Sequence, residues 1–317
     1  MKKAINKVHV EGRVYDFTIA EKVTGDGSKN PGTAYIGGTL DIATDEACLN
    51  VIKVEFTYVT ATTKAGQPNR TYGVLQKIIN DGKTVLKDGK DVATMVKIDS
   101  NLGLNDFYTD RNGEETLVSA KRVQGGFVTI VSALDEDETK RNTFECDMLI
   151  NKVTRIEADA EKHIDKDYIV VKGAVFDFRN AILPVEFVVK SDGGMKYFES
   201  LDVSPQNLVF TKVWGKINSE TIVRRVEEES AFGEPSVKEY TRILREWVIT
   251  GTSKPDSVYE IGDEETGITT DEIKKLMADR EVYLADVKKR ADDYKASKAG
   301  AAPSVATAPA SVGGFDF

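Results

Sequence analysis

The chain has 317 residues, 40% hydrophobic and 30% charged, which is enough for one large domain or two domains of ordinary size. It carries 43 Lys and Arg against 52 Asp and Glu, a net charge of −9. This balance argues against indiscriminate coating of nucleic acid but allows a local basic groove, because salt screens charges beyond roughly 10 Å. No apolar run approaches the roughly 20 residues of a membrane helix, and MKKAINKVHVEG lacks the apolar core of a signal peptide, so we expect a cytoplasmic protein with no membrane partner.

The first predicted strand, KVHVEGRVYDF (Lys7 to Phe17), resembles a later segment, YIVVKGAVFDF (Tyr168 to Phe178). Both alternate with the period of two that is typical of β-strands. A looser match follows in the same order, between FECDMLINKVTRIE (Phe144 to Glu157) and YTRILREWVITGT (240 to 252). The simplest interpretation is two copies of one β-rich domain.

Further short runs rich in β-branched and aromatic residues are bounded by Gly, Asn, Asp or Pro, as strands are: IGGTLDIA, ACLNVIKVEF, GGFVTIV, LPVEFVV and NLVFTKVWGKI. Five or six such strands per copy predict a mainly β chain with two tandem OB-fold-like small β-barrels. An open β-sandwich is the alternative. TYGVLQKIINDGK (Thr71 to Lys83) has helical spacing and predicts a short helix that plugs the first barrel.

These patterns divide the chain into four parts. We expect a first barrel with the inserted helix at 1–157, a second barrel at 158–256, a connector and amphipathic helix at 257–298, and a flexible tail at 299–317. Thr269 and Glu272 form a capping box at the start of that helix. Its apolar stripe predicts packing on the second barrel or, alternatively, dimerisation, so a homo-oligomer stays possible.

The sequence contains no arrangement typical of an enzyme. The phosphate loop, the HExxH zinc motif and the GxSxG nucleophile motif are all missing from it. Its two cysteines, Cys48 and Cys146, have no metal-site spacing and are expected to be reduced. Its two histidines, His9 and His163, stand mid-strand and in a charged connector. We therefore expect no enzyme activity, no cofactor and no metal site.

NLVFTKVWGKI (Asn207 to Ile217) is the most informative segment for function. With a period of two, one face of this strand carries Phe210, Lys212, Trp214 and Lys216. Aromatic rings accept unpaired bases by stacking, and ammonium groups meet phosphates, so this alternation is typical of single-stranded nucleic-acid binding. The alternative is a buried Trp214 with lysines that merely extend to solvent.

Other basic and aromatic residues are weaker candidates for the same surface, with packing as the alternative. They are Arg13 in the first strand, Arg224 and Arg225 after the lysine strand, and Phe107, Tyr108, Lys121, Arg122 and Phe127 in the first domain.

Several segments of the second half resemble the single-stranded DNA-binding proteins encoded by tailed phages and prophages of Gram-positive bacteria, which have tandem OB folds. They are VVKGAVFDFRNAILPVEFVV, KYFESLDVSPQNLVFTKVWGKI, ESAFGE and REWVITGT. The likeness covers residues 160 to 252 best and the first domain more faintly. It implies a protein of the bacterial host cytoplasm.

The chain ends on GGFDF after a stretch of small residues. This ending resembles the acidic tail tip with a terminal phenylalanine by which bacterial single-stranded DNA-binding proteins dock on replication and repair enzymes. The resemblance implies that Phe315, Asp316 and Phe317 bind partner proteins. One aspartate replaces the usual acidic run, which puts shared partners in doubt, and docking in the protein's own basic groove is an alternative.

The leading hypothesis is sequence-independent binding of single-stranded DNA during phage-type replication or recombination, with the tail tip recruiting replication and recombination proteins. The principal alternative is a phage structural or assembly adaptor without DNA affinity. A metal-dependent nuclease is the weakest, because no group of acidic residues is distinguished by its spacing.

Overall fold

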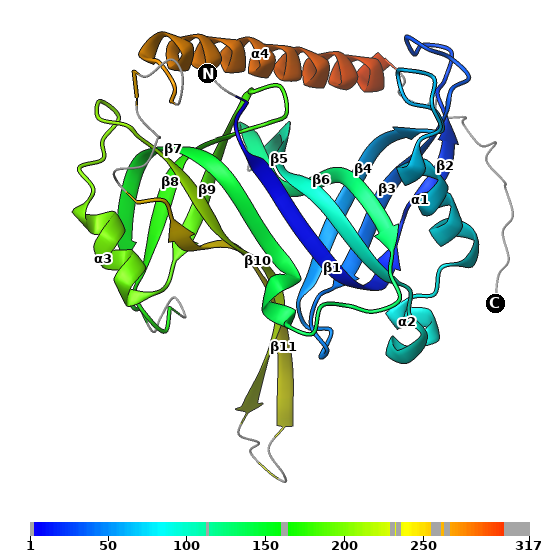
Figure 1. Ribbon diagram of the computed structural model, residues 1–317, viewed down its shortest axis with the longest axis horizontal. Helices are drawn as coiled ribbons and strands as arrows, with labels where there is room; N and C mark the ends of the chain where they lie inside the picture. The colour runs from blue at the N-terminus through cyan, green and yellow to red at the C-terminus, as the bar shows by residue number, and fades with distance from the viewer. Residues whose placement is uncertain are drawn as a thin grey trace, which may run out of the picture.

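A computed structural model describes residues 3–111, 114–159, 164–228, 232, 236–254, 261–262 and 267–300. Most of this part of the chain is β-structure, and one long helix follows the last strand (Figure 1). The strands are β1 (Asn6–Phe17), β2 (Ala20–Val23), β3 (Ala34–Ala43), β4 (Val51–Thr60), β5 (Met95–Arg111), β6 (Glu114–Ile130), β7 (Asn142–Ile156), β8 (Tyr168–Phe176), β9 (Ile182–Val189), β10 (Val209–Glu228) and β11 (Ser236–Thr252). The helices are α1 (Arg70–Asp81), α2 (Val85–Asp88), α3 (Asp192–Ser200) and α4 (Thr270–Gly300), with 3-10 turns η1 (Lys90–Val92) and η2 (Glu138–Lys140).

The first barrel closes through β1, β3, β4, β6 and β5, and back to β1. All of these pairs are antiparallel except β4 with β6. Alternate residues of β1 face the interior, where Val8, Val10 and Val14 are buried. The predicted helix is α1, which lies between β4 and β5 in the chain. Asn69 is its N-cap, and its residues Leu75 and Ile78 are buried.

The second barrel repeats this order with β7, β8, β9, β11 and β10. Its parallel pair is β9 with β11, and α3 occupies the place that α1 has in the first barrel. The predicted fold class, a mainly β chain with small barrels and a C-terminal helix, is confirmed.

The two barrels share one continuous sheet, because β1 of the first barrel pairs with β7 of the second. Each of these two strands begins with a buried asparagine that bonds to another strand of its own barrel, β5 in the first and β10 in the second. Asn6 Nδ2 donates to the carbonyl of Leu102 at 2.9 Å, and Asn142 Nδ2 donates to that of Ile217 at 2.9 Å. Buried amides need such partners, so both asparagines fix the sheet where the barrels meet.

The pairing corrects two expectations from the sequence. The strand β7 opens the second barrel, so the connection between barrels lies at 131–141 and not near residue 158. The matched segments Lys7–Phe17 and Tyr168–Phe178 fall on β1 and β8, a first strand and a second strand. Period-two alternation is shared by every half-buried strand, so similarity between two segments did not identify equivalent strands.

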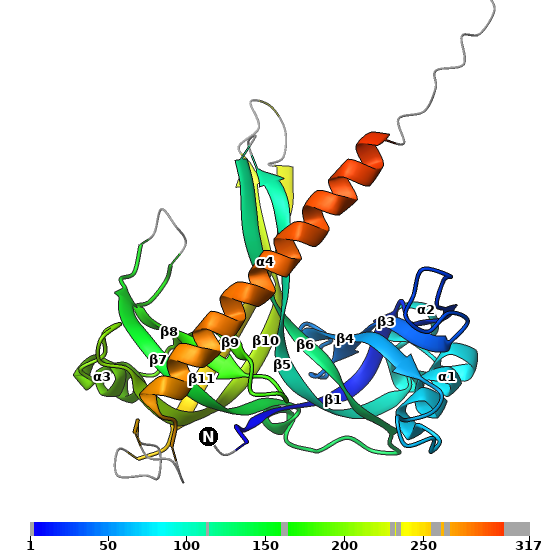
Figure 2. The same ribbon diagram turned by 90° about the horizontal axis from the view of Figure 1, so that it is seen from above.

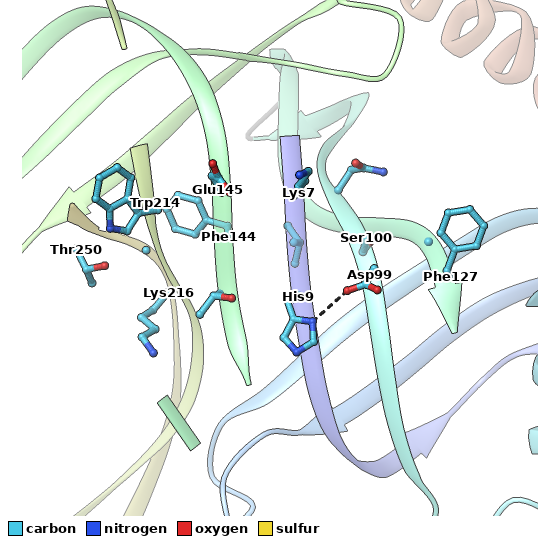
Figure 3. A pocket seen from close by; sticks show the side chains of 15 residues that line it. Lys7, His9, Asp99, Ser100, Phe127, Phe144, Glu145, Trp214, Lys216 and Thr250 are labelled. Atoms are coloured by element: carbon cyan, nitrogen blue, oxygen red, sulfur yellow. Dashed lines mark hydrogen bonds and ion pairs between the residues drawn. The ribbon is translucent and has the colours of Figure 1, made fainter. Parts of the chain in front are cut away.

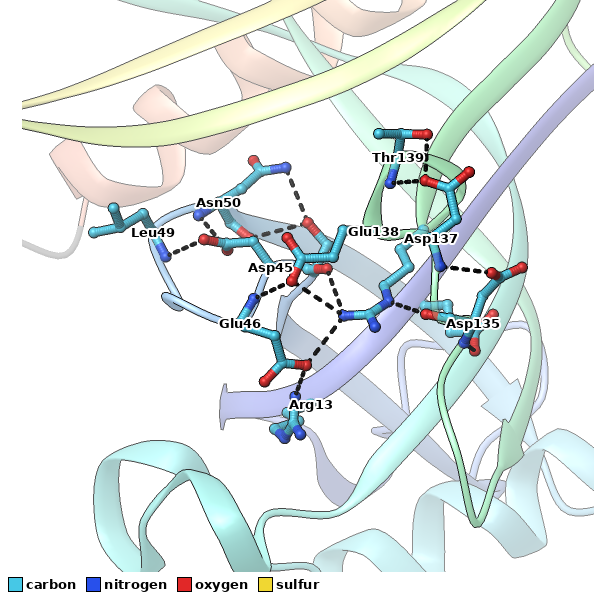
Figure 4. Close-up of polar contacts among 12 residues, drawn as sticks. Arg13, Asp45, Glu46, Leu49, Asn50, Asp135, Asp137, Glu138 and Thr139 are labelled. Atoms are coloured by element: carbon cyan, nitrogen blue, oxygen red, sulfur yellow. Dashed lines mark hydrogen bonds and ion pairs between the residues drawn. The ribbon is translucent and has the colours of Figure 1, made fainter.

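The connection between the barrels is held by a polar cluster around the buried Arg141 (Figure 4). Its Nε donates to the Asp135 carbonyl at 2.7 Å, and its Nη1 lies 3.4 Å from Glu46 Oε1. Glu46 also receives Arg13 Nη1 at 2.8 Å, and its amide donates to Glu138 Oε1 at 3.0 Å. Asp135 and Glu138 therefore take part in tying the first barrel to the start of β7.

Two long hairpins extend from the barrels as arms (Figures 1 and 2). The β5–β6 arm lies against the second barrel, where Lys121 Nζ donates to the Glu186 carbonyl at 2.8 Å. The β10–β11 arm lies against the first barrel, where the amide of Thr221 donates to the Leu49 carbonyl at 3.0 Å. Each barrel is thus contacted by the arm of the other.

Helix α4 begins on the second barrel and runs along the β5–β6 arm (Figure 2). The predicted capping box is present, since Glu272 N donates to Thr269 Oγ1 at 3.2 Å and Thr269 N to Glu272 Oε2 at 2.9 Å. Ile273 is buried against the second barrel. No helix in the described ranges is long and apolar enough to cross a membrane.

Candidate nucleic-acid interface

A hollow of about 660 Å³ crosses the shared sheet where the barrels meet (Figure 3). We call it the front groove and define it by six of its lining residues, Lys7, His9, Asp99, Phe127, Trp214 and Lys216. They come from β1, β5, β6 and β10, strands of both barrels.

Strand register explains why these side chains share one face. Directly opposite residues form a row across five strands: Lys216 of β10, Thr143 of β7, His9 of β1, Asp99 of β5 and Phe127 of β6. A second row joins Trp214, Glu145 and Lys7. Opposite residues of antiparallel strands point to the same side. Four strand spacings of about 4.8 Å put the two ends of the first row roughly 19 Å apart.

Trp214 is presented to this groove by the residue beneath its ring. Its side chain is 41% exposed. A Cβ at Gly251, on the neighbouring strand β11, would lie 2.4 Å from Trp214 Nε1 and 2.5 Å from Cε2, so the indole rests directly on the glycine backbone. One side of the ring is therefore supported, and the ring is held in place before any ligand arrives.

Phe127 is turned outward by a glycine pair. Gly125 and Gly126 have φ values of +66° and +119°, which L side chains rarely adopt, and the β5–β6 register shifts beside them. A Cβ at Gly126 would lie 2.1 Å from the Asp99 carbonyl oxygen. The resulting bulge leaves Phe127 76% exposed. Both glycines lie inside β6.

The charges of the groove are mixed, with unpaired lysines beside compensated groups. Neither Lys7 nor Lys216 forms an ion pair within the described ranges, whereas Lys212 Nζ lies 2.8 Å from Glu145 Oε1. Partial burial lowers the pKa of Lys216, and Asp137 opposes that shift. His9 places Nδ1 3.1 Å from Asp99 and Nε2 3.3 Å from Glu11, so both ring nitrogens face carboxylates. The free ammonium groups are suited to an anionic ligand.

Comparison with known proteins places the chain in a family. The model of the family described as YorF matches residues 4–290. The chain belongs to the YorF family. No curated protein matches it. Among solved structures, a deletion mutant of the single-stranded DNA-binding protein from Thermus aquaticus is similar, with a TM-score of 0.46 and 11% identity over 81% of this chain and 97% of that one.

One predicted residue of the lysine strand is buried in this YorF-family chain. Phe210 is 6% exposed and meets Phe176 edge-on at 6.1 Å between ring centres. It belongs to the cluster that contains Ile268 and Ile273, at the start of α4. Phe210 does share a face with Trp214, but α4 covers that end of the face, so Phe210 cannot stack with a base.

Besides Lys212, three predicted basic residues lie outside the front groove. Arg13 pairs with Glu46 in the cluster around Arg141. Arg122 forms an ion pair with Glu55 on the other side of the first barrel. Lys121 lies over the ring of Trp247 at 5.2 Å, and burial lowers its pKa. The aromatic residues Phe107 and Tyr108 lie on the β5–β6 arm, where Lys288 of α4 is placed over the Tyr108 ring at 5.4 Å.

The remaining predicted residues lie partly or wholly outside the described part of the chain. Arg224 and Arg225 lie on β10, but their side chains are outside the described part. Phe315, Asp316 and Phe317 lie outside the described residues.

In the ranges that are described, no group of His, Cys, Asp and Glu has the arrangement of a metal site. Both cysteines are free, and Cys146 is buried.

Sequence reasoning missed Lys7, His9 and Gly251. Lys7 and His9 alternate with buried valines, which indicates an outward face but not its neighbours. They lie beside Trp214 because β1 pairs with β7, and no local sequence pattern predicts that pairing. Gly251 gave no signal beyond a glycine near the end of a strand.

Proposed function

We propose that the protein binds single-stranded DNA in the front groove without reading its sequence. The observation that carries this proposal is the placement of two exposed rings, Trp214 and Phe127, on the same sheet face as Lys7 and Lys216, two lysines without an ion pair in the described part of the chain. Base stacking on aromatic side chains contributes roughly 1 to 3 kcal/mol per base and is tolerant of sequence. The lysines supply the charge that phosphates require.

The groove geometry favours an unpaired strand over a duplex. Rings at its two sides accept bases only when those bases are free to leave a stack. In a chain of net charge −9, binding also has to be local, which a groove with a few free cations allows. The protein acts in this proposal by holding the strand, not by chemical turnover.

The biological role that we propose is protection of single strands in phage-type replication or recombination, with Phe315, Asp316 and Phe317 recruiting partner proteins. A terminal ring can fill an apolar pocket while Asp316 meets a basic residue. Support for this role is the sequence resemblance of the second half and of the GGFDF ending.

The proposed function is tested by fluorescence titration with oligo-dT at low salt. Trp247 is 5% exposed, so stacking should quench mainly the emission of Trp214. We expect the double variant Lys7→Glu, Lys216→Glu to lose most of its affinity, and Lys275→Glu on α4 to bind like the parent. If the double variant binds as tightly as the parent, the front groove is not the site.

One observation favours a second candidate function, an assembly adaptor without DNA affinity. The β10–β11 arm exposes apolar side chains at Ile222, Val223 and Ile243, as protein-docking surfaces do. A gel shift with single-stranded DNA, duplex and RNA, with and without magnesium, separates the two. The adaptor predicts no shift with any oligomer, and a nuclease would degrade them when magnesium is added.

A further inference from the structure

A second groove, of about 890 Å³, lies between the first barrel and the β10–β11 arm. We call it the arm groove and define it by Tyr15, Asp41, Lys53, Glu55, Arg122 and Arg245. The first five belong to the first barrel, and Arg245 belongs to β11 of the second. It contains two residues, Lys121 and Arg122, that the sequence suggested for nucleic-acid contacts but that the front groove does not use.

The two grooves use opposite faces of the β10–β11 hairpin. Trp214 and Lys216 point into the front groove. The arm groove is lined by Ser219 of β10 and by Arg245 of β11, which lies directly opposite it. Both residues have odd numbers, so their side chains point to the other side of the hairpin from Trp214 and Lys216. A ligand on one face therefore does not compete for the side chains of the other.

The arm groove has more cations than carboxylates. Lys53, Lys121, Arg122 and Arg245 line it together with Asp41 and Glu55. Arg122 pairs with Glu55, and Lys53 Nζ lies 3.5 Å from Asp41 Oδ2. Arg245 has no ion pair within the described part of the chain. An excess of two positive charges, in a protein that is acidic overall, is suited to a polyanion.

The groove also has one tyrosine ring, and two more lie further along the strands that line it. Tyr15 lines the groove. On β3 and β4, the two strands that supply Asp41 and Lys53, the rings of Tyr35 and Tyr58 lie 4.7 Å apart, and Tyr58 is 48% exposed. Cations around the half-buried ring of Tyr15 suit single-stranded nucleic acid better than an acidic peptide, which has no bases to stack.

We propose that the arm groove binds a second segment of single-stranded nucleic acid while the front groove holds the first. The inference rests on the proposed function, because it assigns the same class of ligand to a separate site. Two sites on opposite faces of one hairpin allow one chain to hold two strands, or two distant parts of one strand, at the same time.

The test is the number of short oligomers bound per chain, measured by native mass spectrometry together with Trp214 quenching. Oligo-dT of about 8 nucleotides is within the range that one barrel covers. We expect two oligomers per parent chain. Arg245→Glu should bind one, with its Trp214 quenching unchanged, and Arg245→Lys should recover the second. Arg242→Glu is the matched control, because Arg242 lies three residues from Arg245 on the other face of β11, and this variant should bind two.

The outcomes separate this inference from the proposed function. One oligomer per parent chain with full quenching overturns the second site and leaves the front groove standing. Two oligomers on Arg245→Glu, with its folding verified by circular dichroism, overturn the location. If polyglutamate of equal charge displaces the second oligomer at lower concentration than free oligo-dT does, the groove takes an acidic peptide and the proposal is wrong. No binding of any oligomer contradicts both proposals.

Discussion

Arg280 of α4 donates two hydrogen bonds to Asp106 of β5, from Nη1 to Oδ2 at 2.8 Å and from Nη2 to Oδ1 at 2.6 Å. Ser119 Oγ adds a third donor to the same carboxylate at 2.6 Å. The Asp106 side chain is almost fully buried. This contact attaches helix α4 to the β5–β6 arm, which extends from the first barrel and lies against the second. It therefore helps to fix the two barrels around the front groove.

Replacing Arg280 by Ala should destabilise the protein strongly. The change leaves a buried carboxylate without its cation, a loss of about 3 to 5 kcal/mol in the free energy of unfolding. Arg290→Ala on the same helix is the control, because Arg290 and Asp286 form an exposed pair that contributes about 0.5 kcal/mol or less. Urea denaturation measures both. Equal, small losses for the two variants would show that the Arg280–Asp106 contact does not stabilise the fold.

Gly251→Ala should weaken binding by displacing the indole of Trp214. The added methyl would lie 2.4 Å from Nε1, so the ring must move off its support. We expect a changed emission maximum and a loss of affinity for oligo-dT close to that of Trp214→Ala, roughly fivefold or more for the loss of one stacked base. Gly73→Ala is the control, since nothing lies within 4 Å of the Cβ it would add. Parent-like emission and affinity in Gly251→Ala would contradict the supported-ring account.

Salt should weaken binding with a slope that counts the phosphates that the protein neutralises. For single strands, the logarithm of affinity falls by roughly 0.7 per neutralised phosphate for each tenfold rise in salt. Lys7→Gln should lower that slope by about 0.7, and Lys275→Gln on α4 should not change it. Titrations at several salt concentrations give the slope. An unchanged slope in Lys7→Gln would exclude a phosphate contact at that lysine.

The cluster around Arg141 predicts a pH dependence of stability. Hydrogen bonds from Arg13 and then Lys90 lower the pKa of Glu46 from its ordinary 4.5 to about 2. The folded state therefore favours the carboxylate, and the stabilisation is fully present above pH 4.5 and is lost as the pH falls toward 2. Glu46→Gln should be less stable than the parent at pH 7, and the difference should shrink below pH 4.5. Unfolding free energies at pH 7, 4 and 3 measure this. A difference that stays constant across these pH values would contradict the assignment.

Local sequence patterns predicted the parts of this structure that depend on neighbours along the chain. Alternation placed Trp214 and Lys216 on one exposed face, and helical spacing with the Thr269–Glu272 capping box found α1 and the start of α4. Long-range arrangement was beyond such patterns. Three features depend on packing or pairing between elements that are distant in the chain. Helix α4 covers Phe210, β7 belongs to the second barrel, and Lys7 lies near Trp214.

The most direct measurement is the Trp214 emission of the parent and of Trp214→Phe, titrated with oligo-dT at low salt. We expect saturable quenching in the parent and little change in Trp214→Phe, whose remaining Trp247 is buried. If the strand binds but quenches neither protein, bases do not stack on Trp214; if no binding occurs at low salt, single-stranded DNA is not the ligand.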